Sequence, residues 1–164
     1  MVNASAMSEN WRYERALGRI DDFRRELGRT LSENVDLVEQ ERAVQKLVQD
    51  IGLELMREVF QQADTQSPEV TINGKKWGNR RSSDGTYTTT FGELKLPRST
   101  YSPSGGGKIA VAIDYRLGIV EGRYTPLVAK IVCRSLASMP AEEAAALLKE
   151  AGIAAVSSST LHRL

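Results

Sequence analysis

The sequence contains one cysteine, Cys133, and one histidine, His162, among its 164 residues. One residue of each kind can build neither a disulfide framework nor a zinc site of cysteines and histidines. Because Cys133 stands among apolar, helix-forming residues, we interpret it as a small buried hydrophobe without chemistry. No metal ion or other cofactor is expected.

Long apolar runs are also missing. The longest, such as Ile109 to Ile113, have about five residues, whereas a membrane-spanning helix needs roughly 20. The N-terminal residues lack the basic and apolar regions of an export signal. Hydrophobic residues make up 41% of the chain and charged residues 26%, as in globular proteins. We therefore expect a cytoplasmic protein that does not contact a membrane.

The net charge of +1 hides an uneven distribution along the chain. Residues 1–64 hold 9 Lys and Arg against 13 Asp and Glu, a balance of −4, whereas residues 65–164 hold 13 against 8, a balance of +5. A basic half is typical of proteins in which one part binds a polyanion and the other part has a different task.

The first of three expected parts, residues 1–64, is predicted to be a helical hairpin. Residues 9–29 and 33–63 place apolar residues at three- and four-residue intervals, which is typical of amphipathic helices. Thr30 and Glu33 have the spacing of a capping box, and Asn34 is a second candidate N-cap. Two interpretations stay open: the hairpin packs on its own domain, or it forms a coiled coil through which two copies dimerise.

The second part, residues 65–118, is predicted to be a small antiparallel β-subdomain. Its pattern changes to period two, and Asn73-Gly74 favours a two-residue type I′ hairpin turn. Asp84-Gly85 is predicted to be a second such turn, and Phe91-Gly92 a bend. The apolar run from Ile109 to Asp114 resembles a strand.

The third part, residues 119–164, is predicted to be a helix-turn-helix-like helical subdomain. Thr125-Pro126 is a strong helix start signal, for a helix that ends near Ala137. A second helix is expected to start at Ser138 and Pro140 and to end before Gly152, and Ser157 caps a third. The side chains expected to face inward are Leu127, Val128, Ile131, Val132, Leu136, Ala144, Leu147, Leu148 and Ala151. The fold class is therefore α+β.

The last predicted helix carries the main candidate site. Small and hydrogen-bonding residues on its outer face suit an approach to base edges and phosphates, as a recognition helix requires. The candidate DNA-binding residues are Ser157, Ser158, Ser159, Thr160, His162 and Arg163. The alternative is a solvated terminal helix without a ligand.

A second candidate DNA-binding group lies on the predicted hairpins and consists of Lys75, Lys76, Arg80 and Arg81. Trp77 stands among them, and Lys95 and Arg98 lie nearby in the sequence. Basic residues interleaved with aromatic ones suit phosphate contact and base stacking. A solvated face over a core tryptophan is an equally good interpretation.

A series of motifs now supports a resemblance to a known family. In chain order they are Thr88 and Thr90, Phe91-Gly92-Glu93-Leu94, Arg98, Tyr101, Asp114, Leu117-Gly118, Thr125-Pro126, Glu142-Glu143-Ala144 and Val156 to Thr160. This order resembles the N-terminal region of bacterial insertion-sequence DDE transposases related to Kra-type elements, over somewhat more than half of the chain. The resemblance implies a DNA-binding segment that precedes an RNase H-like catalytic domain beyond residue 164, so we expect a fragment or a truncated relative.

Three motifs of metal or phosphate sites are absent or incomplete in this sequence. Relatives often carry a Cys-x-x-Cys pair after the tyrosine, where this sequence has Ser102 to Gly107, so a metal-bound knuckle is not expected. A transposase site needs three carboxylates around two magnesium ions, and Asp114 is the only acid in a strand-like apolar context. Gly105 to Lys108 also lacks the full phosphate-binding loop pattern. We therefore expect no catalysis by this chain.

Two functional hypotheses follow from the sequence. In the first, the chain is the DNA-binding N-terminal portion of an insertion-sequence transposase and recognises double-stranded DNA through a helix-turn-helix and basic hairpins. In the second, it is a protein-interaction or dimerisation module, a regulator derived from a transposase, that acts through its N-terminal helices.

Overall fold

The computed structural model describes residues 14–30, 36–103 and 107–153 of the chain. The chain divides into two compact units, Met1–Glu58 and Val59–Leu164. Helices and a four-stranded antiparallel sheet are both present, so the predicted α+β class is confirmed. Within the described ranges, no helix combines the length and the apolar content needed to cross a bilayer.

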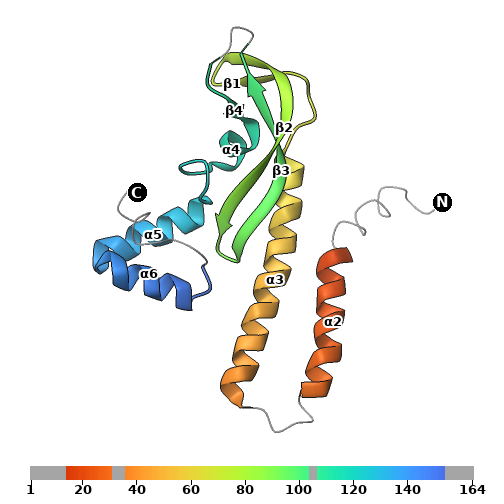
Figure 1. The fold of residues 1–164 in the computed structure, drawn as a ribbon, viewed down its shortest axis with the longest axis vertical. Helices are drawn as coiled ribbons and strands as arrows, with labels where there is room; N and C mark the ends of the chain where they lie inside the picture. The colour runs from red at the N-terminus through yellow and green to blue at the C-terminus, as the bar shows by residue number, and fades with distance from the viewer. Residues whose placement is uncertain (1–13, 31–35, 104–106, 154–164) are drawn as a thin grey trace, which may run out of the picture. The chain divides into compact units, whose positions relative to one another are not determined.

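The first unit contains helix α2, Glu14–Thr30, and most of helix α3, Leu37–Ala63 (Figure 1). Asp36 caps α3: its carboxylate accepts a hydrogen bond of 3.3 Å from the Val38 amide, and its carbonyl accepts one from the Gln40 amide. This satisfies amide donors that the first helical turn leaves unpaired. The predicted caps between Thr30 and Asn34 fall largely on residues 31–35, outside the described part.

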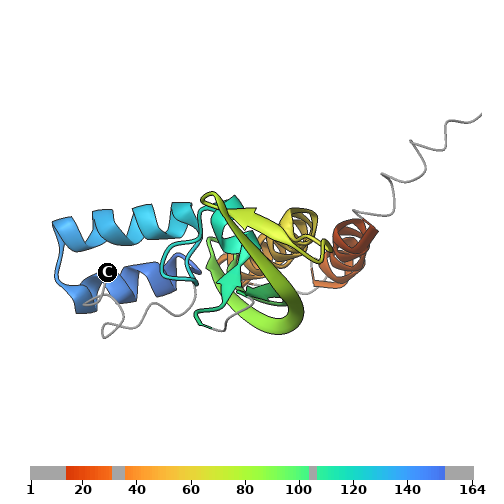
Figure 2. The ribbon, with the colours of Figure 1, turned by 90° about the horizontal axis from the view of Figure 1, so that it is seen from above.

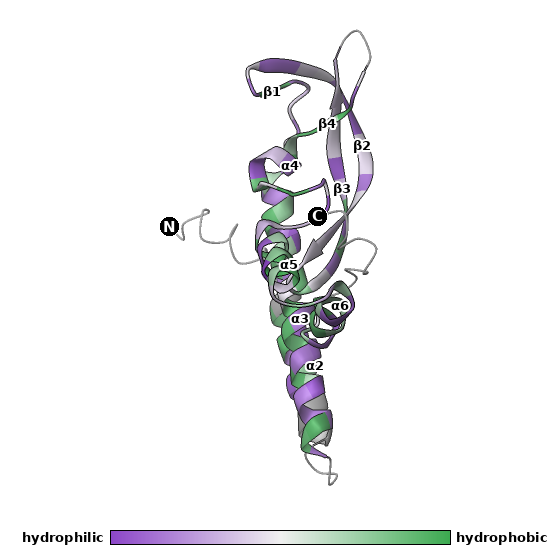
Figure 3. Ribbon diagram, turned by 90° about the vertical axis from the view of Figure 1, so that its left-hand side faces the viewer, coloured by the Kyte–Doolittle hydropathy of each residue, from purple (hydrophilic) through white to green (hydrophobic). Residues whose placement is uncertain are grey.

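Helix α3 carries an exposed apolar stripe, defined as Leu37, Val44, Val48, Leu55 and Val59. Successive members are seven or four residues apart, which places them on one side of a helix. Between 39% and 66% of each side chain is exposed. Figure 3 shows how hydrophobic and hydrophilic residues alternate along this helix.

The second unit is built on a sheet of strands in the order β1-β2-β3-β4. The strands are β1, Val70–Ile72; β2, Lys75–Thr89; β3, Gly92–Ser102; and β4, Ala110–Val111. Asn73 and Gly74 have φ angles of 50° and 76°, as a type I′ turn requires. The predicted β1–β2 hairpin turn is therefore confirmed.

The second predicted turn, Asp84-Gly85, is wrong. Strand β2 continues through both residues, and Gly85 pairs with Leu96 of β3. A Cβ atom on Gly85 would lie 2.6 Å from Cδ of Arg98. The glycine is there because the Arg98 side chain crosses over it, and the chain reverses later, before Gly92.

The predicted strand from Ile109 to Asp114 is also only partly correct. Strand β4 has two residues, and helix α4, Ala112–Leu117, follows at once and ends at Gly118 with φ 63°. Ala112 and Ile113 are buried at the start of this helix. Asp114 therefore lies in the first turn of a short helix and not in a strand.

Helices α5, Pro126–Ser138, and α6, Ala141–Glu150, lie side by side (Figure 2). Their core is a cluster of Tyr124, Val128, Ala129, Val132, Ala144, Leu148 and Ile153. Gly152, at φ 74°, closes α6: its amide bonds to the Lys149 carbonyl and the Ile153 amide to the Leu148 carbonyl, as in a Schellman motif.

Several expectations for this helical pair are wrong. Leu127, Leu147 and Ala151 were expected inside but are exposed, the two leucines to 56% and 47%. The reason is that the two short helices α5 and α6 bury only the side chains that form their core cluster. Cys133 is exposed rather than buried, since it faces away from that stripe. The third helix of the predicted helix-turn-helix falls on residues 154–164, outside the described part.

Candidate nucleic-acid interface

The candidate DNA-binding residues fall in two places. Ser157, Ser158, Ser159, Thr160, His162 and Arg163 lie outside the described residues. Lys75, Lys76, Arg80 and Arg81 all lie on strand β2, and all four are exposed. The structure thus brings one of the two predicted groups together on a single strand.

Lys75 and Lys76 follow the β1–β2 turn directly and stand at the end of a two-stranded ribbon. Nζ of Lys75 lies 5.1 Å from the centroid of the Trp77 ring, a distance at which an ammonium is attracted to an aromatic face. Trp77 itself packs against the buried cluster of Ile72, Tyr101, Ala110 and Ala112. The ring therefore orients a lysine instead of offering an open platform for a base.

A β-bulge separates the lysines from the arginines. Gly78 pairs with Ser102 and Arg81 with Thr100, so two residues of β2, Asn79 and Arg80, oppose one residue of β3. Asn79 has a φ of 48°. A bulge of this kind bends the strand and changes the direction of neighbouring side chains.

Arg80 has a structural role at this bulge. Its Nε donates a hydrogen bond of 3.0 Å to Oγ of Ser99, and its Nη2 donates to Oε1 of Gln66. Lys76 and Arg81 make no salt bridge within the described part of the chain. The cations available to an anionic ligand are therefore Lys75, Lys76 and Arg81, which we call the ribbon cations.

Residues that the sequence analysis missed hold the segment before this ribbon in place. The Asp64 carboxylate accepts hydrogen bonds from the Ser99 amide, at 3.1 Å, and from its hydroxyl, at 3.0 Å. Two carbonyl oxygens are acceptors for the Tyr101 hydroxyl, that of Thr65 at 3.2 Å and that of Ser67 at 3.0 Å. The sequence gives no local sign of these bonds, because the partners stand more than 30 residues apart.

Arg98 and Asp114 belong to an interior cluster with Tyr87 and not to the basic surface. The Tyr87 hydroxyl donates to Oδ1 of Asp114 at 2.7 Å and accepts from Nη1 of Arg98 at 2.9 Å. The Arg98 and Asp114 side chains are 20% and 17% exposed. The sequence did contain one sign that Arg98 is partly buried: the period of two along a strand places it on the same face as the buried Leu94 and Leu96.

Burial shifts the acid–base properties of this cluster. It raises the pKa of the Tyr87 hydroxyl above its ordinary value. It also raises the pKa of Asp114, against the opposing effects of the Tyr87 hydrogen bond and the Arg98 charge. The hydrogen bond to Tyr87 and the ion pair with Arg98 hold the Asp114 carboxylate in an internal contact. No group of three or more metal-ligating side chains occurs among the residues described.

Comparison with protein families, curated proteins and solved structures finds no match for this chain. The function is therefore inferred from the residues themselves.

Proposed function

We propose that this chain is the DNA-binding N-terminal portion of an insertion-sequence transposase and that the β1–β2 ribbon contacts double-stranded DNA. The observation that carries the proposal is the position of the ribbon cations, Lys75, Lys76 and Arg81, exposed on one strand. Phosphate contacts by lysine and arginine supply most of the sequence-independent affinity for DNA.

The shape of the ribbon also supports the proposal. A two-stranded antiparallel ribbon fits the major groove of B-form DNA, which is about 12 Å wide. Lys75 and Lys76 stand beside the turn, where a ribbon approaches the groove first, and Arg81 lies beyond the bulge. This spacing suits contacts to phosphates at more than one level of the groove.

Sequence-specific contacts are proposed for the C-terminal segment. Ser157, Ser158, Ser159 and Thr160 are small enough for a close approach to DNA, and His162 and Arg163 can reach base edges or phosphates. In this proposal the ribbon supplies affinity and the C-terminal segment supplies discrimination between sequences. No catalytic step is assigned to the chain, because Asp114 binds Tyr87 in the interior.

Neutralising the ribbon cations is expected to weaken DNA binding in a salt-dependent way. In a K75Q/K76Q/R81Q variant, the slope of log affinity against log salt concentration is expected to become shallower by ~0.9 for each phosphate that the ribbon no longer neutralises. Fluorescence anisotropy of a labelled duplex, measured over a range of salt concentrations, gives this slope. The loss of affinity is expected to be similar for unrelated sequences, because phosphates carry no sequence information.

Lys46→Gln is the matched control, because Lys46 is an exposed lysine of α3 in the other unit. This variant is expected to keep the wild-type slope. An equal slope for the triple variant and the wild type would show that the ribbon cations do not contact DNA phosphates.

The exposed apolar stripe of α3 favours a second candidate function, self-association through the N-terminal helices. Val44 and Val48 are 44% and 53% exposed in the middle of this stripe, and burying such side chains stabilises association by roughly 25 cal/mol per Å². Sedimentation equilibrium is expected to show a dimer that a V44E/V48E variant converts to a monomer. A wild-type chain that is already monomeric at every concentration would exclude this function.

A further inference from the structure

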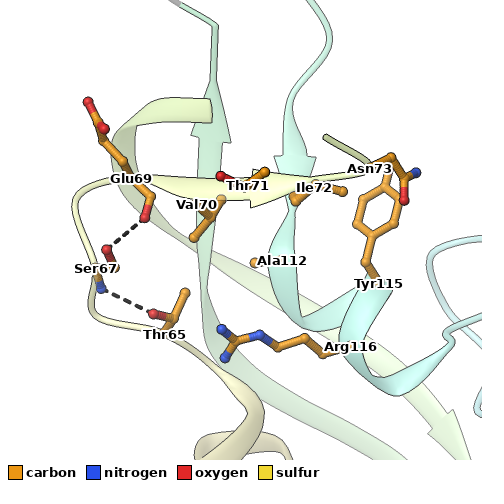
Figure 4. Close-up of a pocket in the computed structure, with 10 residues that line it drawn as sticks. All are labelled: Thr65, Ser67, Glu69, Val70, Thr71, Ile72, Asn73, Ala112, Tyr115 and Arg116. Carbon is orange, nitrogen blue, oxygen red and sulfur yellow. Dashed lines mark hydrogen bonds between the residues drawn. The ribbon is translucent and has the colours of Figure 1, made fainter. Parts of the chain in front are cut away.

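The second unit contains an open cleft of about 450 Å³ that the proposed DNA contacts do not use (Figure 4). All three residues of strand β1 line it, so it runs along that strand. Its other walls come from the segment before β1 and from helix α4, which contributes Ala112, Tyr115 and Arg116. A volume of this size is within the range of ligand-binding clefts, roughly 300–1,000 Å³.

One wall of the cleft is an edge of the sheet. Among the residues that the structure describes, strand β1 is the outermost strand of the sheet and pairs with β2 alone. Ile72 and Lys75 flank the two-residue turn and form a hydrogen-bonded pair, so the next pair, Thr71 and Lys76, is a non-bonded one. The amide and carbonyl of Thr71 therefore point away from β2, in the direction in which a further strand would add.

The side chains around this edge differ in charge and size. Arg116 donates one hydrogen bond, from Nη1 to the Ala63 carbonyl at 2.9 Å, and its guanidinium lies along the cleft (Figure 4). Glu69 places a carboxylate near the start of β1, and Tyr115, which is 56% exposed, lies near Asn73 at its other end. Ala112 leaves room between them.

These features favour one class of ligand. A guanidinium binds carboxylates and phosphates alike, so Arg116 alone does not distinguish a peptide from a nucleic acid. The backbone groups of Thr71 recognise an extended peptide, which can add to an exposed sheet edge through main-chain hydrogen bonds. A peptide also supplies alternate side chains that point into a cleft beside the edge.

We propose that this cleft binds an extended peptide segment of a protein partner, which pairs with Thr71 as an added strand and places an acidic side chain against Arg116. The partner is defined by this chemistry: a β-compatible segment with a carboxylate side chain on the face turned toward α4. The proposal does not rest on the proposed function, because none of the ribbon cations lines the cleft, although strand β1 belongs to both surfaces.

The experiment measures anisotropy of a fluorescein-labelled peptide, Thr-Val-Thr-Glu-Thr-Val, against the full chain. Val and Glu alternate with Thr in this probe so that they share one face of an extended strand. We expect saturable binding, and we expect Thr71→Pro to weaken it by about tenfold, because proline lacks the outward amide and is tolerated at such an edge position. Thr71→Val keeps that amide and is the matched control with wild-type binding.

Two further variants test the side-chain contacts. Tyr115→Ala removes an exposed ring and Arg116→Gln removes the charge, and both are expected to weaken binding of the glutamate probe several-fold. A probe with glutamine in place of glutamate is expected to lose its sensitivity to Arg116→Gln. Circular dichroism of each variant checks that the fold is kept.

Three results would overturn the proposal. The first is no binding of the probe at concentrations of about 1 mM. The second is equal binding by Thr71→Pro and Thr71→Val. The third is displacement of the peptide from the K75Q/K76Q/R81Q variant by a short single-stranded oligonucleotide, which would assign the cleft to nucleic acid.

Discussion

Replacing Phe60 by alanine is expected to lower the free energy of unfolding of the second unit by about 3–5 kcal/mol. Phe60 lies near the end of α3 and is 1% exposed. Its ring centroid is 4.7 Å from that of Tyr87, at an interplanar angle of 53°, so the substitution removes an aromatic pair and leaves a cavity. Urea unfolding followed by circular dichroism and by tryptophan fluorescence measures the loss of stability.

Gln61→Ala is the control for this prediction. Gln61 is the next residue of the same helix and is exposed, so its truncation is expected to change stability by about 0.5 kcal/mol or less. If Phe60→Ala were as mild as Gln61→Ala, the Phe60 ring would not be packed against Tyr87 as described.

Arg98→Ala is expected to destabilise the second unit by about 2–4 kcal/mol, because it leaves the Asp114 carboxylate without its cation in a largely buried place. The substitution also removes the donor at 2.9 Å from the Tyr87 hydroxyl. The Arg98 side chain lies over the Tyr87 ring, 5.4 Å from its centroid, so the substitution removes packing together with charge. The same urea titration gives the difference.

Lys95 provides the matched comparison on the same strand. Its ammonium lies 3.4 Å from the Glu93 carboxylate, but its side chain is 76% exposed, and exposed ion pairs contribute ~0–1 kcal/mol. Lys95→Ala is therefore expected to be nearly neutral. Equal effects of Lys95→Ala and Arg98→Ala would show that the interior cluster does not stabilise the fold.

The features that the sequence predicted well are those with a local cause. Asn73-Gly74 forms its type I′ turn because these two residues tolerate positive φ angles. Pro126 opens α5 because its missing amide is not needed in the first turn. Gly152 ends α6 in the left-handed conformation that glycine adopts readily.

The features that the sequence predicted wrongly depend on contacts between distant residues. Asp84-Gly85 has the composition of a turn, but Gly85 is small because the Arg98 side chain passes over it. Leu127 and Leu147 follow the helical pattern, yet a pair of helices covers only part of each apolar face. Such outcomes are determined by the neighbouring element, which the local pattern does not contain.

The candidate site shows the same division. The sequence placed Lys75, Lys76, Arg80 and Arg81 together on the predicted hairpins, and all four lie on strand β2. It did not separate Arg80, whose guanidinium bonds Ser99 and Gln66, from the other three. That distinction requires the bulge at Asn79 and the fold of the segment before β1, both of which are tertiary features.

Amide chemical-shift mapping tests whether the β1–β2 ribbon contacts duplex DNA. Nuclear magnetic resonance spectra of the isotope-labelled chain would be recorded as a short duplex is added at low salt. The account predicts that the amide signals of Lys75, Lys76 and Arg81 and of their strand neighbours shift progressively and return when salt is raised. Unchanged signals for these residues at saturating duplex would contradict it.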